Sequence, residues 1–337
     1  MFDPAVPLVP EGAVSSGERR ALEGGVVTFR RTDVTRFSLT GPGRVACVQG
    51  LVTCDIERAG DGAHLFGALL TVKGMVVTPL WITRLVDEIL VEAPDAGGAA
   101  VRETFTRSLP PRLCRSTDLS AETASVGIYG AGADAMIAGV LRGGPLPPAA
   151  GAVTATVAGR QLVVARAVAR GAPGFDCVVP AAHAAALQDE LASRGAVPAS
   201  PALLEECRIL AGIPRLGAEI DDKTLPQEAR LDELGAVSYT KGCYLGQETV
   251  ARLHFRGHAN RALASVALER GPAGPLPLAL SLDGKPVGRL TSVAWSEVME
   301  GHVGVAVIRR EVADGADVEL PDGSHGVVHG AKWLGTP

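Results

Sequence analysis

The run Lys241-Gly242-Cys243-Tyr244-Leu245-Gly246-Gln247-Glu248 is the densest concentration of chemically capable residues in the sequence. Its glycines allow the backbone to turn tightly or to approach a ligand closely. Apolar residues recur at helical spacing after Gly246, so the pattern predicts that a helix begins there. Cys243 is then expected just before a helix N-terminus and near the Lys241 ammonium. Both features favour the thiolate over the thiol.

Two plainer interpretations stay open for these residues. A single cysteine is often a small buried hydrophobic residue, and Cys243 can have that role. Arg252 and Arg256 lie four residues apart on the predicted helix and, with Arg261, predict a cationic lining for a concave site. The alternative is that these arginines form an ordinary solvated helix face.

The motif KGCYLGQE, which continues as TVARLHFRGHANRAL, resembles the signature of the folate-binding YgfZ family. That family belongs to the superfamily of the glycine-cleavage T-protein, an aminomethyltransferase. Residues 33–55, 208–214 and 225–229 are also similar to the family, so the resemblance spans most of the chain. It leaves out the first twenty or so residues and the loop near residues 143–151.

The resemblance implies an α+β, aminomethyltransferase-like fold. In this fold, two ferredoxin-like units and a C-terminal antiparallel β-barrel surround a central hole where folate binds. It implies tetrahydrofolate, or a one-carbon derivative, as ligand, and a role in assembling or repairing iron–sulfur clusters in client enzymes. Cys243 and Lys241 are the expected chemical groups, and no metal site is expected. The expected folate-binding residues are Arg208, Gly242, Tyr244, Gln247, Glu248, Arg252 and Arg256.

Two positions depart from the transferase pattern that the resemblance implies. The transferase reaction needs a carboxylate near the folate amine to manage a proton. The matching strand, residues 74–80, contains no acid, and Leu210 stands where a pterin-contacting glutamate is expected. Both departures argue against aminomethyl transfer, which stays as the alternative function, and whether the protein is an enzyme remains open.

Two further classes of function remain. Cys243 with His254 or His258 matches the nucleophile and base of a cysteine amidase, although the spacing neither supports nor excludes this pairing. The other class is a pure interaction module that binds folate only as a structural ligand.

Composition limits which partners and which cellular compartment are expected for the protein. The net charge of −5 argues against nucleic-acid binding, and no apolar run is long enough for a membrane span. The proline-rich start lacks the features of a signal peptide. None of the six cysteines forms a C-x-x-C pair, which fits reduced thiols and poorly fits a bound iron–sulfur cluster. We therefore expect a cytoplasmic monomer whose partners are folate and iron–sulfur client or assembly proteins.

The order of patterns along the chain predicts the domains. Residues 1–22 are expected to be a disordered lead-in. Residues 23–112 form a first α+β unit, completed by residues 200–260, and include a hairpin of strands at 65–72 and 75–85. Residues 113–199 form a second, ferredoxin-like unit. Asp-Gly turns punctuate residues 262–337, which predicts a C-terminal β-barrel.

Overall fold

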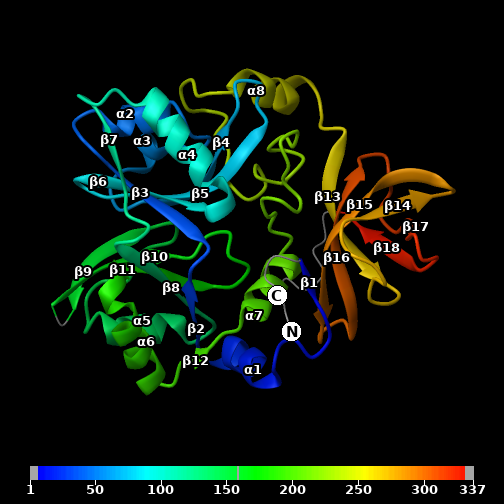
Figure 1. Cartoon of the computed structure of the whole chain (residues 1–337), viewed down its shortest axis with the longest axis horizontal. Helices are drawn as coiled ribbons and strands as arrows, with labels where there is room; N and C mark the ends of the chain where they lie inside the picture. Colours follow the sequence, from blue (N-terminus) through cyan, green and yellow to red (C-terminus); the bar gives the residue numbers. More distant parts are fainter. Residues whose placement is uncertain (1–6, 158, 331–337) are drawn as a thin grey trace.

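The computed structural model describes residues 7–157 and 159–330 of the chain, which form three packed units (Figure 1). The sheet of the first unit has the strand order β4-β5-β6-β3-β7. Helices α2, α3 and α4 cover one face, where a core that includes Phe37, Leu80 and Phe105 is fully buried. The elements are β3 (Val34–Thr40), α2 (Arg44–Gln49), α3 (Ile56–Ala59), β4 (His64–Leu70), β5 (Val76–Arg84), β6 (Glu88–Pro94), α4 (Asp95–Ser108) and β7 (Arg115–Asp118).

The second unit has a six-stranded sheet in the order β12-β2-β8-β11-β10-β9. Helices α5 and α6 pack on one face of this sheet, over residues such as Ile128, Phe175 and Leu187. The elements are β2 (Val27–Arg31), β8 (Thr123–Tyr129), α5 (Ala133–Val140), β9 (Ala152–Val157), β10 (Arg160–Arg166), β11 (Gly174–Pro180), the 3-10 helix η1 (Ala181–His183), α6 (Ala184–Ser193) and β12 (Val197–Pro198).

The two α+β units exchange strands across the expected boundary. Strand β2 was expected in the first unit, but it pairs with β8 and β12 of the second sheet. Strand β7 lies beyond residue 112, yet it pairs with β3 of the first sheet. The reason is that β2 and β3 are joined by only two residues, so the chain passes directly from one sheet to the other at 32–33. Strand β9 also lies in a segment where no strand was predicted.

The C-terminal unit is the predicted antiparallel barrel. Its strands follow the order β15-β14-β17-β18-β13-β16, and pairing between β15 and β16 closes it. At the β14–β15 turn, Asp283 and Gly284 both have positive φ angles, of 51° and 72°, as a two-residue type I′ hairpin requires. The strands are β13 (Arg261–Leu268), β14 (Leu278–Leu282), β15 (Lys285–Ser296), β16 (Gly301–Arg309), β17 (Asp317–Glu319) and β18 (His325–His329).

The expectation of a disordered lead-in is wrong where the structure describes that segment. Strand β1 (Leu8–Val9) adds to the barrel alongside β15, and α1 (Ser16–Gly24) is a helix. A capping box forms at its start, because Ser15 and Glu18 satisfy each other's backbone N–H groups. Glu18 also accepts a hydrogen bond from the backbone N–H of Ser200 at 2.6 Å, which ties α1 to the start of α7. Residues 1–6 lie outside the described part.

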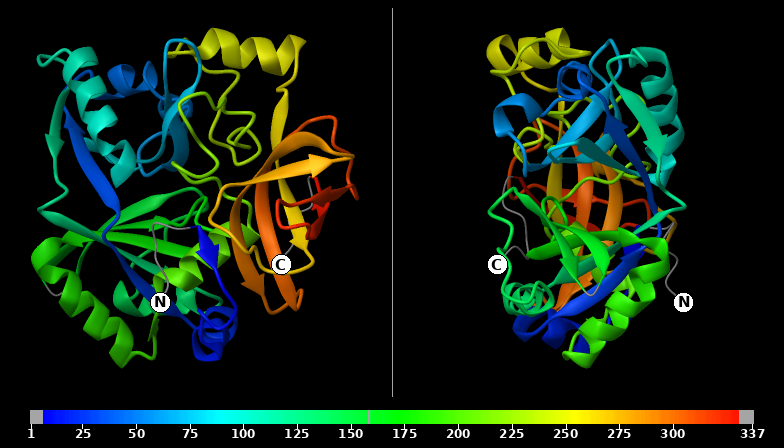
Figure 2. Two further views of the ribbon diagram at one scale, coloured as in Figure 1. Left: turned by 45° about the vertical axis from the view of Figure 1, so that its right-hand side comes forward. Right: turned by 90° about the vertical axis from the view of Figure 1, so that its left-hand side faces the viewer.

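The segment after residue 200 links all three units. Helix α7 (Pro201–Leu210) begins at the predicted N-cap, Ser200, but it packs against β15 and β16 and does not complete the first unit. Residues 211–246 then run as an irregular segment between the first unit and the barrel (Figure 1). Helix α8 (Gln247–Arg256) lies at the outer edge of the molecule, beyond that segment (Figure 2). No helix in the described residues is long and apolar enough to cross a membrane.

Candidate functional site

The motif loop is held in place by the buried side chain of Lys241. Its Nζ atom donates to the backbone carbonyls of Gln49, Val52 and Cys54 at 2.6, 2.8 and 2.7 Å. Burial lowers the pKa of this ammonium to about 8. All three of its donors are therefore used to fix the loop that follows α2. The expected role of Lys241 as a chemical group beside the Cys243 thiol is corrected to a structural one.

Glycines bring the β4–β5 hairpin directly against the start of α8. Gly246, with φ of 80°, is the residue before the helix, as the sequence predicted. A Cβ atom at this position would lie 2.5 Å from the carbonyl oxygen of Thr71 and 2.9 Å from the Cα of Gly74. No other residue fits there without displacing backbone, so the motif loop and the hairpin form one rigid contact.

Cys243 lies exposed on this loop, three residues before Gly246. Cys47 is half-buried, and the other four cysteines are buried. Burial raises the pKa of the Cys54 and Cys207 thiols to about 12 and that of Cys114 to about 11, and it raises the pKa of Cys177 as well. Cys243 is therefore the most accessible thiol among the described residues. This agrees with the expectation of an accessible thiol and not with the alternative of a small buried hydrophobic residue.

Alkylation at neutral pH is expected to label Cys243 before the other five cysteines, because thiolates react and buried thiols stay protonated. The measurement is iodoacetamide labelling of the folded protein, followed by peptide mass spectrometry at successive times. Added tetrahydrofolate should slow labelling of Cys243 if the motif borders the ligand. Labelling of Cys47 or Cys114 as fast as Cys243 would make Cys243 a structural residue.

The remaining motif residues divide into a buried and an exposed set. Tyr244 is buried, and its hydroxyl has no hydrogen-bond partner among the described residues. Burial raises the pKa of this hydroxyl to about 12, so it stays protonated and can still donate to a ligand. Gly242 and Glu248 are exposed and Gln247 is half-buried at the helix start, so these three remain candidates for contact with a ligand.

Arg208 does not have the expected freedom to bind a ligand. Its guanidinium donates to Glu205 at 2.9 and 2.7 Å, to Glu219 at 3.1 Å and to Ser292 at 2.7 Å, and it also donates to the carbonyl of Ile213 at 2.8 Å. These contacts use all five N–H donors of an arginine. Arg208 therefore fastens α7 to the barrel, and its assignment to folate binding is corrected.

The arginines of α8 remain free, whereas Arg261 does not. Arg252 and Arg256 are exposed and form no ion pair with any residue that the structure describes. Arg261 makes two hydrogen bonds of 3.0 Å to Glu228, so it was wrong to expect it to face a ligand. His254 stacks on Tyr239 with ring centroids 3.6 Å apart. No described contact joins it to Cys243, so the geometry does not support an amidase pair.

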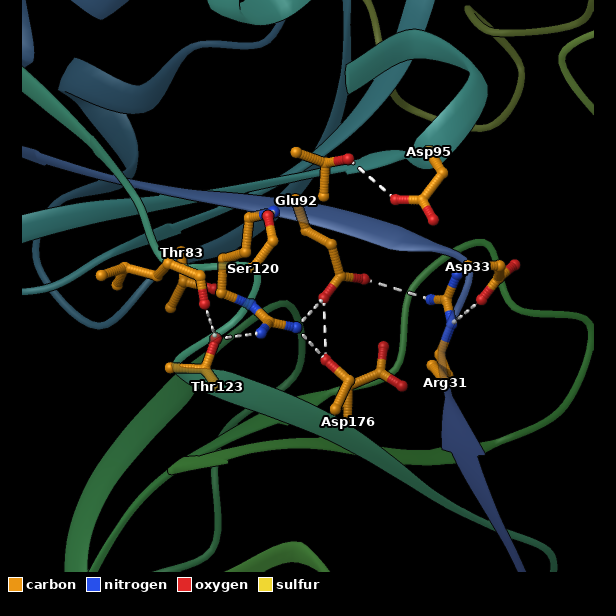
Figure 3. A network of polar contacts seen from close by, with 12 residues as sticks. Arg31, Asp33, Thr83, Glu92, Asp95, Ser120, Thr123 and Asp176 are labelled. Atoms are coloured by element: carbon orange, nitrogen blue, oxygen red, sulfur yellow. Dashed lines mark hydrogen bonds and ion pairs between the residues drawn. The ribbon is translucent and has the colours of Figure 1, made fainter. Parts of the chain in front are cut away.

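A buried charge cluster lies where the sheets of the two α+β units face each other, and sequence reasoning missed it (Figure 3). Glu92 of β6 accepts hydrogen bonds from Arg31 at 3.2 Å, Arg36 at 2.7 Å and Arg170 at 2.7 Å. Ser125 of β8 also donates to Glu92, at 2.9 Å. Glu92 is thus the common partner of three arginines from different parts of the chain.

Asp176 of β11 is the second carboxylate of this cluster. It accepts a hydrogen bond from Arg170 at 2.7 Å and one from the Tyr129 hydroxyl at 2.6 Å. The guanidinium of Arg170 also lies 3.8 Å from the ring centroid of Trp81, whose indole N–H donates to the carbonyl of Val168. The acidic pair is therefore joined to Trp81, which belongs to the same apolar cluster as Tyr244 of the motif.

Arginine charges keep both carboxylates ionised. Burial alone would raise the pKa of Glu92, but the charges of Arg31, Arg170 and Arg36 outweigh burial and hold that pKa well below its usual value. The pKa of Asp176 is likewise lowered, because Arg170 and Arg31 outweigh the effect of burial. Such groups can accept hydrogen bonds from a ligand, but they have no proton to donate at neutral pH.

A small cavity of about 20 Å³ lies within this cluster and has room for one water-sized group. His64 lines it, and the Nε2 atom of this buried side chain has no partner among the described residues. Burial lowers the pKa of His64 to about 4, so its ring is neutral. The one sequence feature that pointed here was Glu92 itself, an acid that follows the apolar run at residues 89–91 within strand β6. Its partners are far away in the sequence.

The chain matches the family model "GCVT N-terminal domain" over residues 11–239. It is 31% identical to the tRNA-modifying protein YgfZ of Serratia proteamaculans, over 73% of this chain and 72% of the relative. It is also 26% identical to an aminomethyltransferase of Parafrankia sp., over 94% and 87% of the two chains. The solved aminomethyltransferase T of Bartonella henselae superposes with a TM-score of 0.83 at 18% identity, covering 98% and 91%.

The fold is that of the T-protein of the glycine cleavage system. The chain belongs to the GCVT N-terminal domain family, with YgfZ among its relatives, as its sequence motifs suggested.

Proposed function

We propose that this chain is a tetrahydrofolate-binding accessory protein that serves the assembly or repair of iron–sulfur clusters in client enzymes, and that it does not transfer an aminomethyl group. The observation that carries the folate part is the ionised pair Glu92 and Asp176 at a buried cavity beside Trp81. The family membership supports a folate-related ligand in general terms.

The Asp176 carboxylate of the acidic pair fits one edge of a pterin. The amino-pyrimidinone ring of a pterin presents an amino group and a ring N–H, both of them donors, and a carboxylate has about four acceptor positions. Glu92 has all of these positions filled by Arg31, Arg36, Arg170 and Ser125. Asp176 accepts only from Arg170 and Tyr129, so it keeps about two positions free for the two donors of the pterin. The cavity between Glu92 and Asp176 has the size of an amino group. The exposed Arg252 and Arg256 are then candidates for the carboxylates of the folate tail.

The same residues argue against aminomethyl transfer. The strand that would supply the acid, residues 74–80, has none, and Thr78 in that strand faces Gly97 of α4. Arginines pair with Glu92 and Asp176 and lower the pKa of both, so neither is a free carboxylate that could take over the proton. The chain therefore binds the ligand but lacks the acid–base group that the transfer reaction requires.

The iron–sulfur part of the proposal rests on Cys243. An exposed thiol on a rigid loop can meet a partner protein, and a thiolate is the ligand that iron–sulfur clusters prefer. The iron–sulfur cluster of a client enzyme is then the substrate of this process, and it is not a permanent cofactor of this chain. The name of the YgfZ relative refers to tRNA, but a net charge of −5 argues against nucleic acid as a direct partner here.

Tetrahydrofolate is expected to bind in calorimetry, and Asp176→Asn is expected to weaken binding by about tenfold, the effect of losing one charge-assisted hydrogen bond. Asp87→Asn is the matched control, because Asp87 is exposed at the β5–β6 turn. The measurement is made at a temperature where circular dichroism shows that both variants are folded. Absence of heat at millimolar tetrahydrofolate with wild-type protein would exclude folate as the ligand.

A cell that lacks this protein is expected to lose part of the activity of its iron–sulfur enzymes and to regain it with the wild-type gene. Cys243→Ala should fail to restore that activity, whereas Cys47→Ala should restore it because Cys47 is half-buried against the core of the first unit. Full rescue by Cys243→Ala would leave a folate-binding module without thiol chemistry. No loss of activity in the original cell would refute the iron–sulfur role altogether.

A further inference from the structure

Helix α8 presents an exposed face that combines an aromatic ring with positive charges. Phe255 is 66% exposed and is the one aromatic ring among the exposed large apolar side chains of the described residues. Its ring packs edge-on against His254, with ring centroids 4.8 Å apart, so it is held in place from one side only. Arg252 and Arg256 lie next to it, because positions three or four residues apart, and adjacent positions at the helix end, share one side of α8. An exposed aromatic ring that is already held in place can anchor another molecule.

The tip of the β4–β5 hairpin extends this face. Val72 is 76% exposed at the tip, and Lys73 beside it is exposed as well. A Cβ atom at Gly74 would lie 3.0 Å from the Cβ of Thr249, so the tip touches the first turn of α8. Thr249 and Arg252 are three residues apart and therefore neighbours on the helix surface. The hairpin tip thus lies beside the arginines of α8 (Figure 1).

The exposed thiol of Cys243 borders the same surface. Gly246 follows it by three residues and lies against the hairpin at Thr71 and Gly74. The loop that carries the thiol, the hairpin and α8 therefore meet at one rigid contact. A molecule that binds across the hairpin tip and α8 comes close to this thiol.

The charge of this surface is opposite to that of the whole chain. Lys73, Arg252 and Arg256 are exposed and have no ion pair among the described residues, and they outnumber Glu248, the exposed acid on this face of α8. The chain as a whole carries a net charge of −5. Cations gathered in this way on an acidic protein favour an acidic partner, because complementary charges speed association and select against basic surfaces.

We propose that α8 and the tip of the β4–β5 hairpin form a docking surface for an acidic segment of a partner protein that also carries an apolar side chain. The carboxylates of the segment meet Lys73, Arg252 and Arg256, and its apolar side chain packs against Phe255. Docking brings the segment beside the Cys243 thiol. The docking itself needs neither folate nor a cluster, whereas the identity of the partner as an iron–sulfur client rests on the proposed function.

Disulfide exchange at Cys243 tests this docking on the full chain. The probe is a short peptide of glutamate, glycine and one leucine, whose single cysteine is joined by a mixed disulfide to thionitrobenzoate. The Cys243 thiolate attacks the peptide sulfur, a protein–peptide disulfide forms, and thionitrobenzoate leaves as a coloured thiolate, while the thiol proton passes to the buffer. Each rate is divided by that of the same peptide with N-acetylcysteine, and Cys243→Ser gives the background from the other cysteines.

At low ionic strength the glutamate peptide should react at least about tenfold faster than a peptide with lysine in place of glutamate. About 0.5 M salt should remove most of this preference, because salt screens exposed charges. Arg252→Glu should remove it as well. Arg20→Glu is the matched control and should keep it, since Arg20 is exposed on α1, at the opposite end of the molecule from α8 (Figure 1).

Phe255→Ser tests the apolar anchor. It should slow the glutamate peptide by at least about threefold, the effect of losing part of one apolar contact. Val327→Ser is the control and should react as the wild type does, because Val327 is exposed on β18 of the barrel.

Millimolar 5-formyltetrahydrofolate, a one-carbon derivative, is expected to leave the ratio of the two peptide rates unchanged. A ratio that this folate abolishes would assign Arg252 and Arg256 to the folate tail and overturn the docking surface. Equal rates for the two peptides on wild-type protein, or a preference that survives Arg252→Glu, would overturn it too. Iron–sulfur activities in cells that carry Cys243→Ala test the client role separately, so a failure of that role and a failure of the docking surface are distinguishable.

Discussion

Lys241→Met is expected to lower the free energy of unfolding by about 3 kcal/mol or more, one of the largest effects of any single substitution in this chain. Methionine keeps the length of the side chain but removes the ammonium. The carbonyls of Gln49, Val52 and Cys54 then lose their common donor in a buried place. Each unpaired buried carbonyl costs on the order of 1 kcal/mol or more.

Urea unfolding followed by circular dichroism measures this effect. Lys73→Met is the control, because Lys73 is exposed at the tip of the neighbouring hairpin and should change stability by less than about 0.5 kcal/mol. The Lys241 variant should also label faster at Cys54, since the loop that covers this thiol is loosened. A stability change for Lys241→Met as small as that for Lys73→Met would mean that the three contacts contribute nothing to the folded state.

Glu92→Gln is expected to destabilise the protein by about 3 kcal/mol at pH 7, because it removes the carboxylate that three buried arginines share and leaves only Asp176 beside Arg170 and the exposed Asp33 beside Arg31. The effect depends on pH in a defined direction. The folded-state pKa of Glu92 is held well below the ordinary value of 4.5. Its ionised form therefore contributes stability above about pH 4.5, and that contribution is lost as the pH falls toward the folded-state value.

Unfolding free energies measured between pH 3 and pH 7 should show this difference. Wild-type stability should fall as the pH drops below about 4.5, since the unfolded chain then binds a proton that folded Glu92 does not. The Gln variant should start lower and fall less, because Asp176 and other carboxyls with a lowered pKa, such as Glu18 and Asp55, still contribute in the same way. Glu122→Gln, at an exposed turn, should follow the wild-type curve. Parallel curves for the wild type and Glu92→Gln would contradict the assigned charge cluster.

The sequence allowed the local features of the site to be predicted. The glycine before α8 and the helix after it follow from residue type and spacing, and so do the Ser200 cap of α7 and the Asp-Gly turns of the barrel. The exposure of Cys243 agrees with its position between two glycines. In each case the decisive interaction joins residues that are close together in the sequence.

The contacts that failed to be predicted join distant residues. Lys241 was expected to act on Cys243, two positions away, but its ammonium reaches carbonyls nearly two hundred residues earlier. Glu92 gathers Arg31, Arg36 and Arg170, and no spacing rule connects these four positions. Arg208 binds Glu205 one helical turn earlier, a local pair, but Glu219 and Ser292 reach its remaining donors only through the tertiary fold. A basic residue in a motif therefore does not indicate whether its charge is free.

The placement of β2 in the second sheet has a consequence for synthesis on the ribosome. Val27 pairs with Tyr129, so this strand leaves the ribosome about a hundred residues before its partner exists. At about 5–20 residues per second the strand waits for roughly 5–20 seconds. It carries Arg30 and Arg31, and charges of this kind discourage a waiting strand from pairing with another chain. Arg31, which later binds Glu92, thus also protects the nascent chain from aggregation.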